Sequence, residues 1–510
     1  MVTKMSDSLK YQAYYTKSAS ILSYMTKMLS LRDHDYVWEP CGGDGVFVDR
    51  VLEENSSVKI DVFELDPKAV SLLTKKYSQT SNVNIKGADT LLDGQVLSRI
   101  PQYDKIIGNP PYGARNTLEK KQKLNCLYPG LYVKESYTLF LYACTHCLKE
   151  GGILSFIIPD TFLSLHRHIA IRKFLLRNTK IKELSLFPSS FFPGVNFGYA
   201  NLCIITLEKS SDVNHNLENN IKIRTGFQNV EELDSSNCGS VKLLSQRGIL
   251  NNIDSAFLLN STDRILELLN NADLPKIGDL AACVTGFYSG DDKTYLRVSN
   301  SEVRNAKRYR LIDNDLVQSV PSKREKLGGI QSFRCFVPIV KGGNIQYIKK
   351  NQWFMDWSVQ AVLNYRTSKK SRFQNSEFYF KNGIAIPMIR SSKLTGALIE
   401  GRLFDQSIVG VFPKDESWII YFLGFFNSNI CTQLINAINP SANNSANYIK
   451  KIPVIKPAPS FRAQIEFIVN RILMLLRCGD GNIREYEDKL NELFSDLYLK
   501  GIGKQEPFVQ

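Results

Sequence analysis

The sequence predicts an α/β fold with a doubly wound, mostly parallel sheet, followed by a mixed α+β domain. Two observations support this prediction. Between residues 17 and 159, short apolar runs alternate with segments whose apolar residues recur at helical spacing, which indicates βαβ units. Beyond about residue 210, basic clusters interleaved with aromatic residues and glycines replace this alternation, which favours a second domain with a different role.

The first domain can be divided into elements in chain order. We expect helices over residues 17–30, 46–54, 67–77 and 136–150, and strands over residues 36–39, 59–66, 83–89, 103–109 and 153–159. A polar, weakly patterned stretch at residues 211–222 is interpreted as a linker between domains 1–210 and 223–510. Two helical patterns, over residues 461–478 and 482–499, close the chain.

Composition narrows the classes of protein and partner. The 510 residues are 43% hydrophobic and 22% charged, as in ordinary globular proteins, and the formal charge of +14 favours a polyanionic partner. The start of the chain lacks the apolar core of a signal peptide, and the apolar run at residues 418–426 is too short to span a bilayer. Ten scattered cysteines suit reduced thiols. We therefore expect a cytoplasmic protein without membrane contact.

Metal chemistry is not expected. Cys144 and Cys147 form a lone CxxC inside a helical pattern, with no second pair at zinc-finger spacing, so they are interpreted as buried thiols. His166 and His168 form an HxH, which we interpret as a solvated or phosphate-facing pair.

Acidic residues stand at the ends of three successive predicted strands. The first strand runs into the glycine-rich turn EPCGGDG at residues 39–45, where backbone can approach a ligand closely. Glu64 ends the second strand, where a carboxylate can accept hydrogen bonds from a ribose diol. Asp89, at the end of the third strand, can accept one from an exocyclic amine. Together they predict a pocket for an adenosine with an attached cationic group.

The fourth predicted strand ends in the stretch IIGNPPYGA at residues 106–114. Proline cannot donate to a sheet ladder, and it also keeps the residue before it out of the helical region. Asn109, Pro110, Pro111 and Tyr112 should therefore form a rigid turn that holds its side chains and carbonyl groups in fixed directions.

The ordered set of motifs resembles the gamma class of AdoMet-dependent DNA adenine-N6 methyltransferases of type II restriction-modification systems. YYTKSASILSYM, EPCGGDGVF, FELDPKAV and GADTLL resemble the family's cofactor motifs, and NPPY its catalytic turn. Residues 135–163 resemble the later strands, so the resemblance covers residues 11 to about 209. It implies the Rossmann-like class I AdoMet methyltransferase fold. Residues 338–344, 404–413 and 447–457 more loosely resemble target-recognition domains, as expected for 223–510.

This resemblance implies S-adenosyl-L-methionine as the methyl donor and no metal. The implied cofactor contacts are Thr16, Glu39, Pro40, Cys41, Gly42, Gly43, Glu64, Leu65, Asp89 and Asn109. Cys41 is expected to act through its backbone, because PCGGDG stands where many relatives read PACGDG. The implied catalytic residues are Asn109, Pro110, Pro111 and Tyr112.

The chemistry of adenine N6 suits the rigid turn. This amine is a poor nucleophile, because its lone pair is delocalised into the ring. Hydrogen bonds to the side-chain oxygen of Asn109 and the carbonyl of Pro110 would localise electron density on the nitrogen, and no general base is needed before the methyl group moves. The base must first leave the duplex, and Tyr112 is expected to stack on it.

A second aromatic residue is implied beside the target base. Phe192 stands where relatives carry a Phe before Pro, and Phe191 and Phe197 are alternatives for this role. Core packing would also explain all three residues.

Several other activities fit these motifs less well than DNA adenine-N6 methylation does. A cytosine-C5 methyltransferase would need a thiolate after the fourth strand, where this chain has NPPY, and cytosine N4 is less favoured than adenine by the Asn-first turn. An RNA or protein-glutamine N-methyltransferase would use the same turn, but usually without a large basic domain. A catalytically inactive DNA-binding specificity module would not need the intact motifs. We therefore predict a monomeric enzyme that methylates double-stranded DNA site-specifically and works alongside a separate restriction endonuclease.

Overall fold

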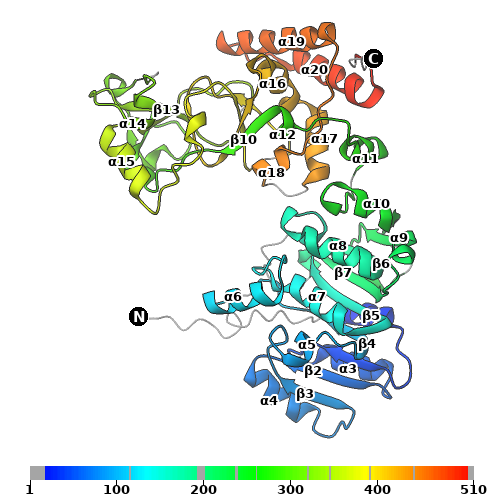
Figure 1. The fold of residues 1–510 in the computed structure, drawn as a ribbon. Coiled ribbons are helices and arrows are strands. Elements are labelled where there is room, and N and C mark those ends of the chain that lie inside the picture. Colours follow the sequence, from blue (N-terminus) through cyan, green and yellow to red (C-terminus); the bar gives the residue numbers. More distant parts are fainter. Residues whose placement is uncertain are drawn as a thin grey trace. The chain divides into compact units, whose positions relative to one another are not determined.

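The structure is a computed structural model that describes residues 18–113, 116–191, 201–235, 239–259, 261–318, 321–343, 346–389, 392–439 and 443–503. The chain divides into two compact units, Met1–Phe257 and Leu258–Gln510 (Figure 1). Each unit is described by itself.

The first unit is built on a nine-stranded sheet with the order β3-β2-β1-β4-β5-β7-β6-β8-β9. Strands β1 to β5 pair in parallel, whereas β7 runs antiparallel to both of its neighbours, β5 and β6. The strands are β1 (Tyr36–Glu39), β2 (Lys59–Glu64), β3 (Val83–Gly87), β4 (Tyr103–Gly108), β5 (Leu148–Pro159), β6 (Thr179–Pro188), β7 (Asn201–Lys209), β8 (Asn220–Thr225) and β9 (Ser240–Ser245).

Helices cover both faces of this sheet. They are α2 (Ala19–Leu29), α3 (Val46–Glu54), α4 (Pro67–Lys76), α5 (Gly94–Leu97), α6 (Leu118–Leu127), α7 (Ser136–Cys147), α8 (Ile169–Asn178), α9 (Val213–Glu218) and α10 (Gln246–Asn251). The chain moves outward from β1 to β3 and then returns through β4 to β5. Right-handed crossovers therefore place α3 and α4 on one face and α5 and α7 on the other. The predicted doubly wound, mostly parallel sheet is confirmed.

Local sequence explains where several of these helices begin. The Ser18 side chain accepts a hydrogen bond from the backbone N–H of Ile21 at the start of α2. Asp66 caps α4 in the same way through the N–H of Lys68, and Pro67 occupies the first turn, where its missing N–H costs nothing. Strand β2 therefore ends at a defined residue, immediately after Glu64.

Strand β4 lies in the middle of the sheet, and its register is set from both sides. Ile106 pairs with Trp38 of β1, and Gly108 pairs with Phe156 of β5. Ile106 and Ile107 are both buried, as expected for a central parallel strand covered on two faces. The residues that follow Gly108 therefore leave the sheet at a fixed position.

Three expectations about these boundaries need correction. Helix α7 ends at Cys147 rather than near residue 150, because β5 begins at Leu148 and pairs with β4 there. Helix α6 was not expected, since its apolar residues show little periodicity. The predicted linker at residues 211–222 contains α9 and the start of β8, which pairs with β6. The first unit therefore extends beyond residue 210, through β9 and α10, to Phe257.

The second unit is a mixed α+β structure, as predicted. Strands β10, β18, β15 and β16 form an antiparallel sheet, and β12, β11, β14, β13 and β17 form a second, mixed sheet. These strands are β10 (Ala281–Thr285), β11 (Leu296–Val298), β12 (Arg310–Leu311), β13 (Phe336–Val340), β14 (Trp353–Asp356), β15 (Ile384–Pro387), β16 (Ala397–Leu398), β17 (Leu403–Phe404) and β18 (Ile408–Pro413). Its helices are α11 (Asp263–Asn270), α12 (Ile277–Leu280), α13 (Asp292–Tyr295), α14 (Glu325–Gly328), α15 (Val359–Thr367), α16 (Ile419–Asn427), α17 (Asn429–Ile438), α18 (Ala446–Ile449), α19 (Pro459–Arg477) and α20 (Arg484–Ser495).

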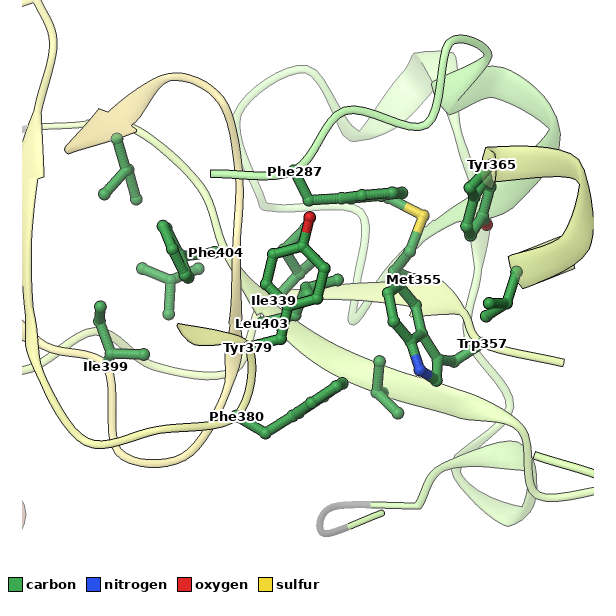
Figure 2. Close-up of a cluster of buried hydrophobic side chains, with 14 of the residues drawn as sticks. Phe287, Ile339, Met355, Trp357, Tyr365, Tyr379, Phe380, Ile399, Leu403 and Phe404 are labelled. Atoms are coloured by element: carbon green, nitrogen blue, oxygen red, sulfur yellow. The ribbon is translucent and has the colours of Figure 1, made fainter. Parts of the chain in front are cut away.

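An aromatic cluster fills the core beside the five-stranded sheet (Figure 2). Phe287 packs edge-on against Tyr365 and Trp357, with ring centroids 4.8 and 5.6 Å apart. The adjoining segments at residues 338–344 and 404–413 are also linked by an ion pair of 2.9 Å between Lys341 and Asp405. Two of the three segments that loosely resemble recognition domains are therefore neighbours in space.

No helix in the described part of the chain is by itself long and apolar enough to cross a membrane. Residues Glu416–Asn427 and Asn429–Ile438 meet the length and composition criteria only as a pair, which bends by 75°. Most residues of α16 are buried in the core of the second unit.

Candidate active site

The candidate site lies at the carboxyl ends of β1, β2 and β4. In a doubly wound sheet, a crevice for ligands opens where neighbouring strands send their connections to opposite faces. Here that point lies between β1 and β4. Glu39 ends β1, Glu64 ends β2, Asp89 follows β3 and Asn109 follows β4. The predicted motifs therefore converge on one edge of the sheet.

The glycine turn after β1 is held close to β2. The N–H of Gly42 donates to the carbonyl of Phe63 at 2.9 Å, and a Cβ atom at Gly42 would lie 2.4 Å from Cγ1 of Val62. Gly43 and Gly45 have φ values of 57° and 79°, in the left-handed region that favours glycine. The turn thus requires glycine for close approach and for backbone conformation.

Glu64, at the end of β2, holds this turn through hydrogen bonds to two backbone N–H groups. One carboxylate oxygen accepts the N–H of Gly43 at 2.8 Å, and the other accepts the N–H of Asp66 at 2.7 Å. A carboxylate offers about four lone-pair positions, so two remain available for the hydroxyl groups of a ribose. Leu65 is 48% exposed beside it and provides an apolar surface for a planar ring.

Glu39 is the most unusual residue of the site. Its side chain is 2% exposed, and Oε2 has no hydrogen-bond partner among the described residues. Burial raises the pKa of this carboxyl well above its ordinary value, and the nearby carboxylates of Asp44 and Glu64 raise it further. A buried acceptor of this kind fits a cationic ligand group, such as the ammonium of S-adenosyl-L-methionine, because the cation would supply the missing partner.

Pro40 and Cys41 connect the glycine turn to its surroundings. The carbonyl of Pro40 accepts a hydrogen bond from the Thr90 hydroxyl at 2.5 Å. The sulfur of Cys41 lies against the end of β4, only 3.4 Å from where a Cβ atom at Gly108 would stand. Burial raises the pKa of the Cys41 thiol well above its ordinary value, and Glu39 adds to the shift. The thiol packs against β4 and has a hydrogen bond with the backbone of Asn109. The contact of Cys41 with the cofactor through its backbone stays a prediction.

Asp89 forms an ion pair that sequence reasoning missed. Its Oδ2 pairs with Nζ of Lys120 on α6, and its Oδ1 accepts the N–H of Leu91 at 3.3 Å. Lys120 lies 31 residues along the chain, in a helix that the sequence pattern did not reveal, so no local signal indicated this contact. The carboxylate predicted to bind an exocyclic amine already binds a cation of the protein.

The NPPY turn follows β4 directly. Asn109 and Pro111 are half-buried, whereas Pro110 and Tyr112 are buried. Tyr112 is 1% exposed, and its ring meets that of Tyr137 edge to face, with centroids 6.5 Å apart and an interplanar angle of 85°. Tyr137 is a second residue that sequence reasoning did not single out.

Some expected site residues lie outside the described part of the chain. These are Thr16, Phe192 and Phe197. Phe191 is described, and its ring stacks on that of Phe187, with centroids 5.8 Å apart and an interplanar angle of 14°. Within the described ranges, there is no group of three or more His, Cys, Asp and Glu side chains that could hold a metal ion.

Comparisons with known proteins find similar sequences among restriction-modification methylases. Residues 11–192 match the model of the Eco57I restriction-modification methylase family. Type II methyltransferase M.HincII of Haemophilus influenzae is 27% identical over 314 residues, which are 52% of this chain and 58% of that protein. Modification methylase CviBIII of Paramecium bursaria Chlorella virus NC1A is 32% identical over 175 residues, 34% of this chain and 43% of that one. The chain thus spans less than two thirds of these relatives.

Two solved structures share the fold over most of the chain. The DrdV–DNA complex, determined by electron cryomicroscopy, aligns with a TM-score of 0.51 at 12% identity, covering 92% of this chain and 57% of that one. The ATP-dependent type ISP restriction-modification enzyme LlaBIII bound to DNA also gives 0.51 at 12% identity, covering 91% and 39%. Residues 11–192 are therefore similar to the Eco57I restriction-modification methylases, and the first unit has a doubly wound α/β fold with a mostly parallel sheet.

Proposed function

We propose that this protein is a site-specific DNA methyltransferase that transfers a methyl group from S-adenosyl-L-methionine to N6 of adenine. The main support is one juxtaposition. A buried carboxyl with an unpartnered oxygen, Glu39, lies at the same sheet edge as the turn Asn109 to Tyr112. The first suits a cationic donor and the second a planar amine, and β1 and β4, which carry them, are adjacent strands.

The residues of the glycine turn would bind the donor. Glu39 would hold its ammonium, the remaining lone pairs of Glu64 its ribose hydroxyls, and Leu65 the face of its adenine. When bound, S-adenosyl-L-methionine supplies an electrophilic methyl group on a sulfonium. The N-terminus of α3 follows the turn and contributes a fixed positive potential toward carboxylate groups.

The turn after β4 would act on the acceptor. The side-chain oxygen of Asn109 and the carbonyl oxygen of Pro110 would accept the two hydrogens of the N6 amine and draw its lone pair out of the ring. Since the register of β4 is set from both sides, these two acceptors keep their directions without rearrangement. Preorganised acceptors of this kind lower the barrier most when the site excludes water.

The second unit supports DNA as the substrate. Arg297 and Arg310 are paired across β11 and β12, and burial together with the neighbouring Arg310 lowers the pKa of Arg297. A phosphate would relieve this like-charge contact. The other exposed basic residues of this unit include Arg304, Lys307, Arg308, Lys323, Arg324, Arg366, Lys369, Lys370 and Arg372. Relatives named as type II methyltransferases support a role in a restriction-modification system. We further propose that the modification protects DNA from a separate restriction endonuclease and that the enzyme acts as a monomer.

Tritiated S-adenosyl-L-methionine and duplex DNA test this proposal. We expect label in DNA, recovered as N6-methyladenine after digestion to nucleosides. Label recovered in RNA or protein, in cytosine, or nowhere would contradict it. Sequencing of methylated adenines in cells that express the chain would then define the recognition site.

A further inference from the structure

A buried polar network lies behind Tyr112. The Tyr137 hydroxyl lies 2.8 Å from Oγ1 of Thr161 and 3.4 Å from Nε2 of His168. The same nitrogen of His168 lies 2.8 Å from a carboxylate oxygen of Glu135. Tyr137 and His168 are almost completely inaccessible to solvent, and Glu135 is buried as well.

This network joins the segments that follow two adjacent strands. Tyr112 comes after β4, Glu135 and Tyr137 lie at the start of α7, and Thr161 and His168 lie in the 3₁₀ helices Asp160–Leu163 and His166–His168 that follow β5. The contacts therefore lie at the carboxyl edge of the sheet, where the turn itself stands, and not in the general core.

His168 can be assigned a protonation state from its neighbours. Nε2 lies 2.8 Å from the Glu135 carboxylate and 3.4 Å from both the Tyr137 hydroxyl and Nε of Arg167. We assign the proton to Nε2 because the carboxylate is the nearer partner, so His168 donates to Glu135. Nδ1 is buried and has no hydrogen-bond partner within the described residues. Burial lowers the pKa of His168, because a buried imidazolium loses its hydration. The ring is thus neutral and held in one orientation.

The second carboxylate oxygen of Glu135 is also engaged. It forms an ion pair with Arg167, whose guanidinium lies 4.9 Å from the centroid of the Tyr132 ring. Both oxygens of Glu135 therefore have partners, and the carboxylate can serve as a fixed anchor for His168.

We infer that Tyr137, His168 and Glu135 are positioning residues that hold the buried ring of Tyr112 in one orientation, the one in which it would stack on the target base once the residues that cover it move aside. This inference rests on the proposed function. Tyr137 meets Tyr112 at 85°, so a tilt of the Tyr112 ring requires Tyr137 to move. The anchored hydroxyl of Tyr137 opposes that movement. A purely apolar core would fill the same space but would set no single orientation.

Tyr137→Phe is the first test, because it keeps the ring and removes only the hydroxyl. Tyr103→Phe is the matched control: it also removes a buried hydroxyl, which donates to Asp61 at 2.8 Å, but at the opposite end of β4. We expect Tyr137→Phe to lower kcat for DNA methylation about threefold to tenfold, the worth of one net hydrogen bond. The Kd for S-adenosyl-L-methionine should stay within twofold, and Tyr103→Phe should change neither quantity.

Substitution of His168 separates positioning from packing. His168→Gln keeps an amide donor for Glu135 and should retain most of the activity, whereas His168→Leu should lose at least as much as Tyr137→Phe. With 2-aminopurine in place of the target adenine, emission of the extruded base should rise in Tyr137→Phe and His168→Leu, because looser stacking on Tyr112 quenches it less. Wild-type kcat and emission in both variants, or equal losses in Tyr103→Phe, would overturn the inference.

A protein-only measurement keeps this test independent of the proposed function. In the full chain labelled with 3-fluorotyrosine, the resonance of Tyr112 is identified by its loss in Tyr112→Phe. We expect it to shift or broaden in His168→Leu and not in Tyr103→Phe. An unchanged resonance overturns the positioning role, while a wild-type protein that methylates no adenine overturns the proposed function instead.

Discussion

The two halves of the candidate site differ in how far the protein satisfies its own polar groups. On the donor half, a buried oxygen of Glu39 has no partner among the described residues. On the acceptor half, the side chains behind Tyr112 bind one another, from Tyr137 through His168 to Glu135. The buried nitrogen without a partner there, Nδ1 of His168, belongs to a neutral ring, whereas Glu39 is a carboxyl that can carry charge. Because a cationic group of the ligand would be the partner of Glu39, ligand binding on the donor half should depend on ligand charge and on pH. A half that is already assembled should depend on geometry. Substitutions in each half should separate these two kinds of dependence.

Asn109→Ala should cause the largest loss on the acceptor half. Removing one preorganised acceptor should lower kcat by about 100-fold to 1,000-fold, by analogy with the loss of one donor from an oxyanion hole. Binding of S-adenosyl-L-methionine, measured by calorimetry, should change less than twofold. A variant that turns over at the wild-type rate would show that the turn does not hold the amine.

Glu39→Gln should act mainly on the donor half. The amide keeps the shape but removes the negative charge, so affinity for S-adenosyl-L-methionine should fall about 10-fold to 100-fold, as for the loss of a buried charged contact. The variant should unfold at a higher temperature without ligand, because the folded chain no longer has to bury a charged carboxylate or protonate it first. Glu53→Gln, on an exposed surface of α3, is the control. Unchanged affinity would remove Glu39 from the site.

The pH dependence of ligand binding should report the same carboxyl. Since its pKa in the folded protein lies well above 4.5, the folded state binds this proton more readily than the unfolded chain does. Its contribution to stability is therefore present at low pH and is lost as the pH rises through the folded pKa. A cationic ligand should expel the proton, so affinity should rise with pH, by at most tenfold per unit. Calorimetry in two buffers should detect proton release in the wild type and none in Glu39→Gln.

Lys120→Ala should have the smallest effect, and its sign is informative. If Lys120 occupies Asp89 until the ligand arrives, its removal should tighten binding of S-adenosyl-L-methionine about twofold to fivefold, in line with a partly exposed ion pair. Lys123→Ala, on the same helix and paired with Glu119, should leave the affinity unchanged. Weaker binding in Lys120→Ala would mean that this lysine contacts the ligand directly.

Contacts between consecutive strand ends could be read from the sequence. The strand containing Tyr36–Glu39 was predicted at its observed bounds. Glu39 and Glu64 end strands, and Asp89 and Asn109 lie within two residues of a strand end. These predictions succeeded because apolar periodicity and turn chemistry are local properties, and parallel strands bring their carboxyl ends to one edge. Which side chains pair with the polar residues at that edge could not be predicted in the same way.

The missed contacts involve side chains that are distant in sequence. Lys120 reaches Asp89 from a helix with almost no apolar periodicity. His168 was interpreted as solvated or phosphate-facing, but it is buried against Glu135, 33 residues earlier. The end of the first unit was also misplaced, because the short polar helix α9 resembles a linker although its residues Asn216 and Leu217 are buried.

Strand β4 is paired in register with a strand on each side, and this limits where the protein tolerates an insertion or a deletion. Strand β4 is matched to β1 on one side and to β5 on the other, and successive side chains point to opposite faces. One residue inserted between Tyr103 and Gly108 would invert every side chain after it relative to both neighbours. The NPPY turn would then face away from the site proposed for S-adenosyl-L-methionine, although its sequence was unchanged. Variation in length belongs instead in the connections, such as the segment that leads from Tyr112 to α6.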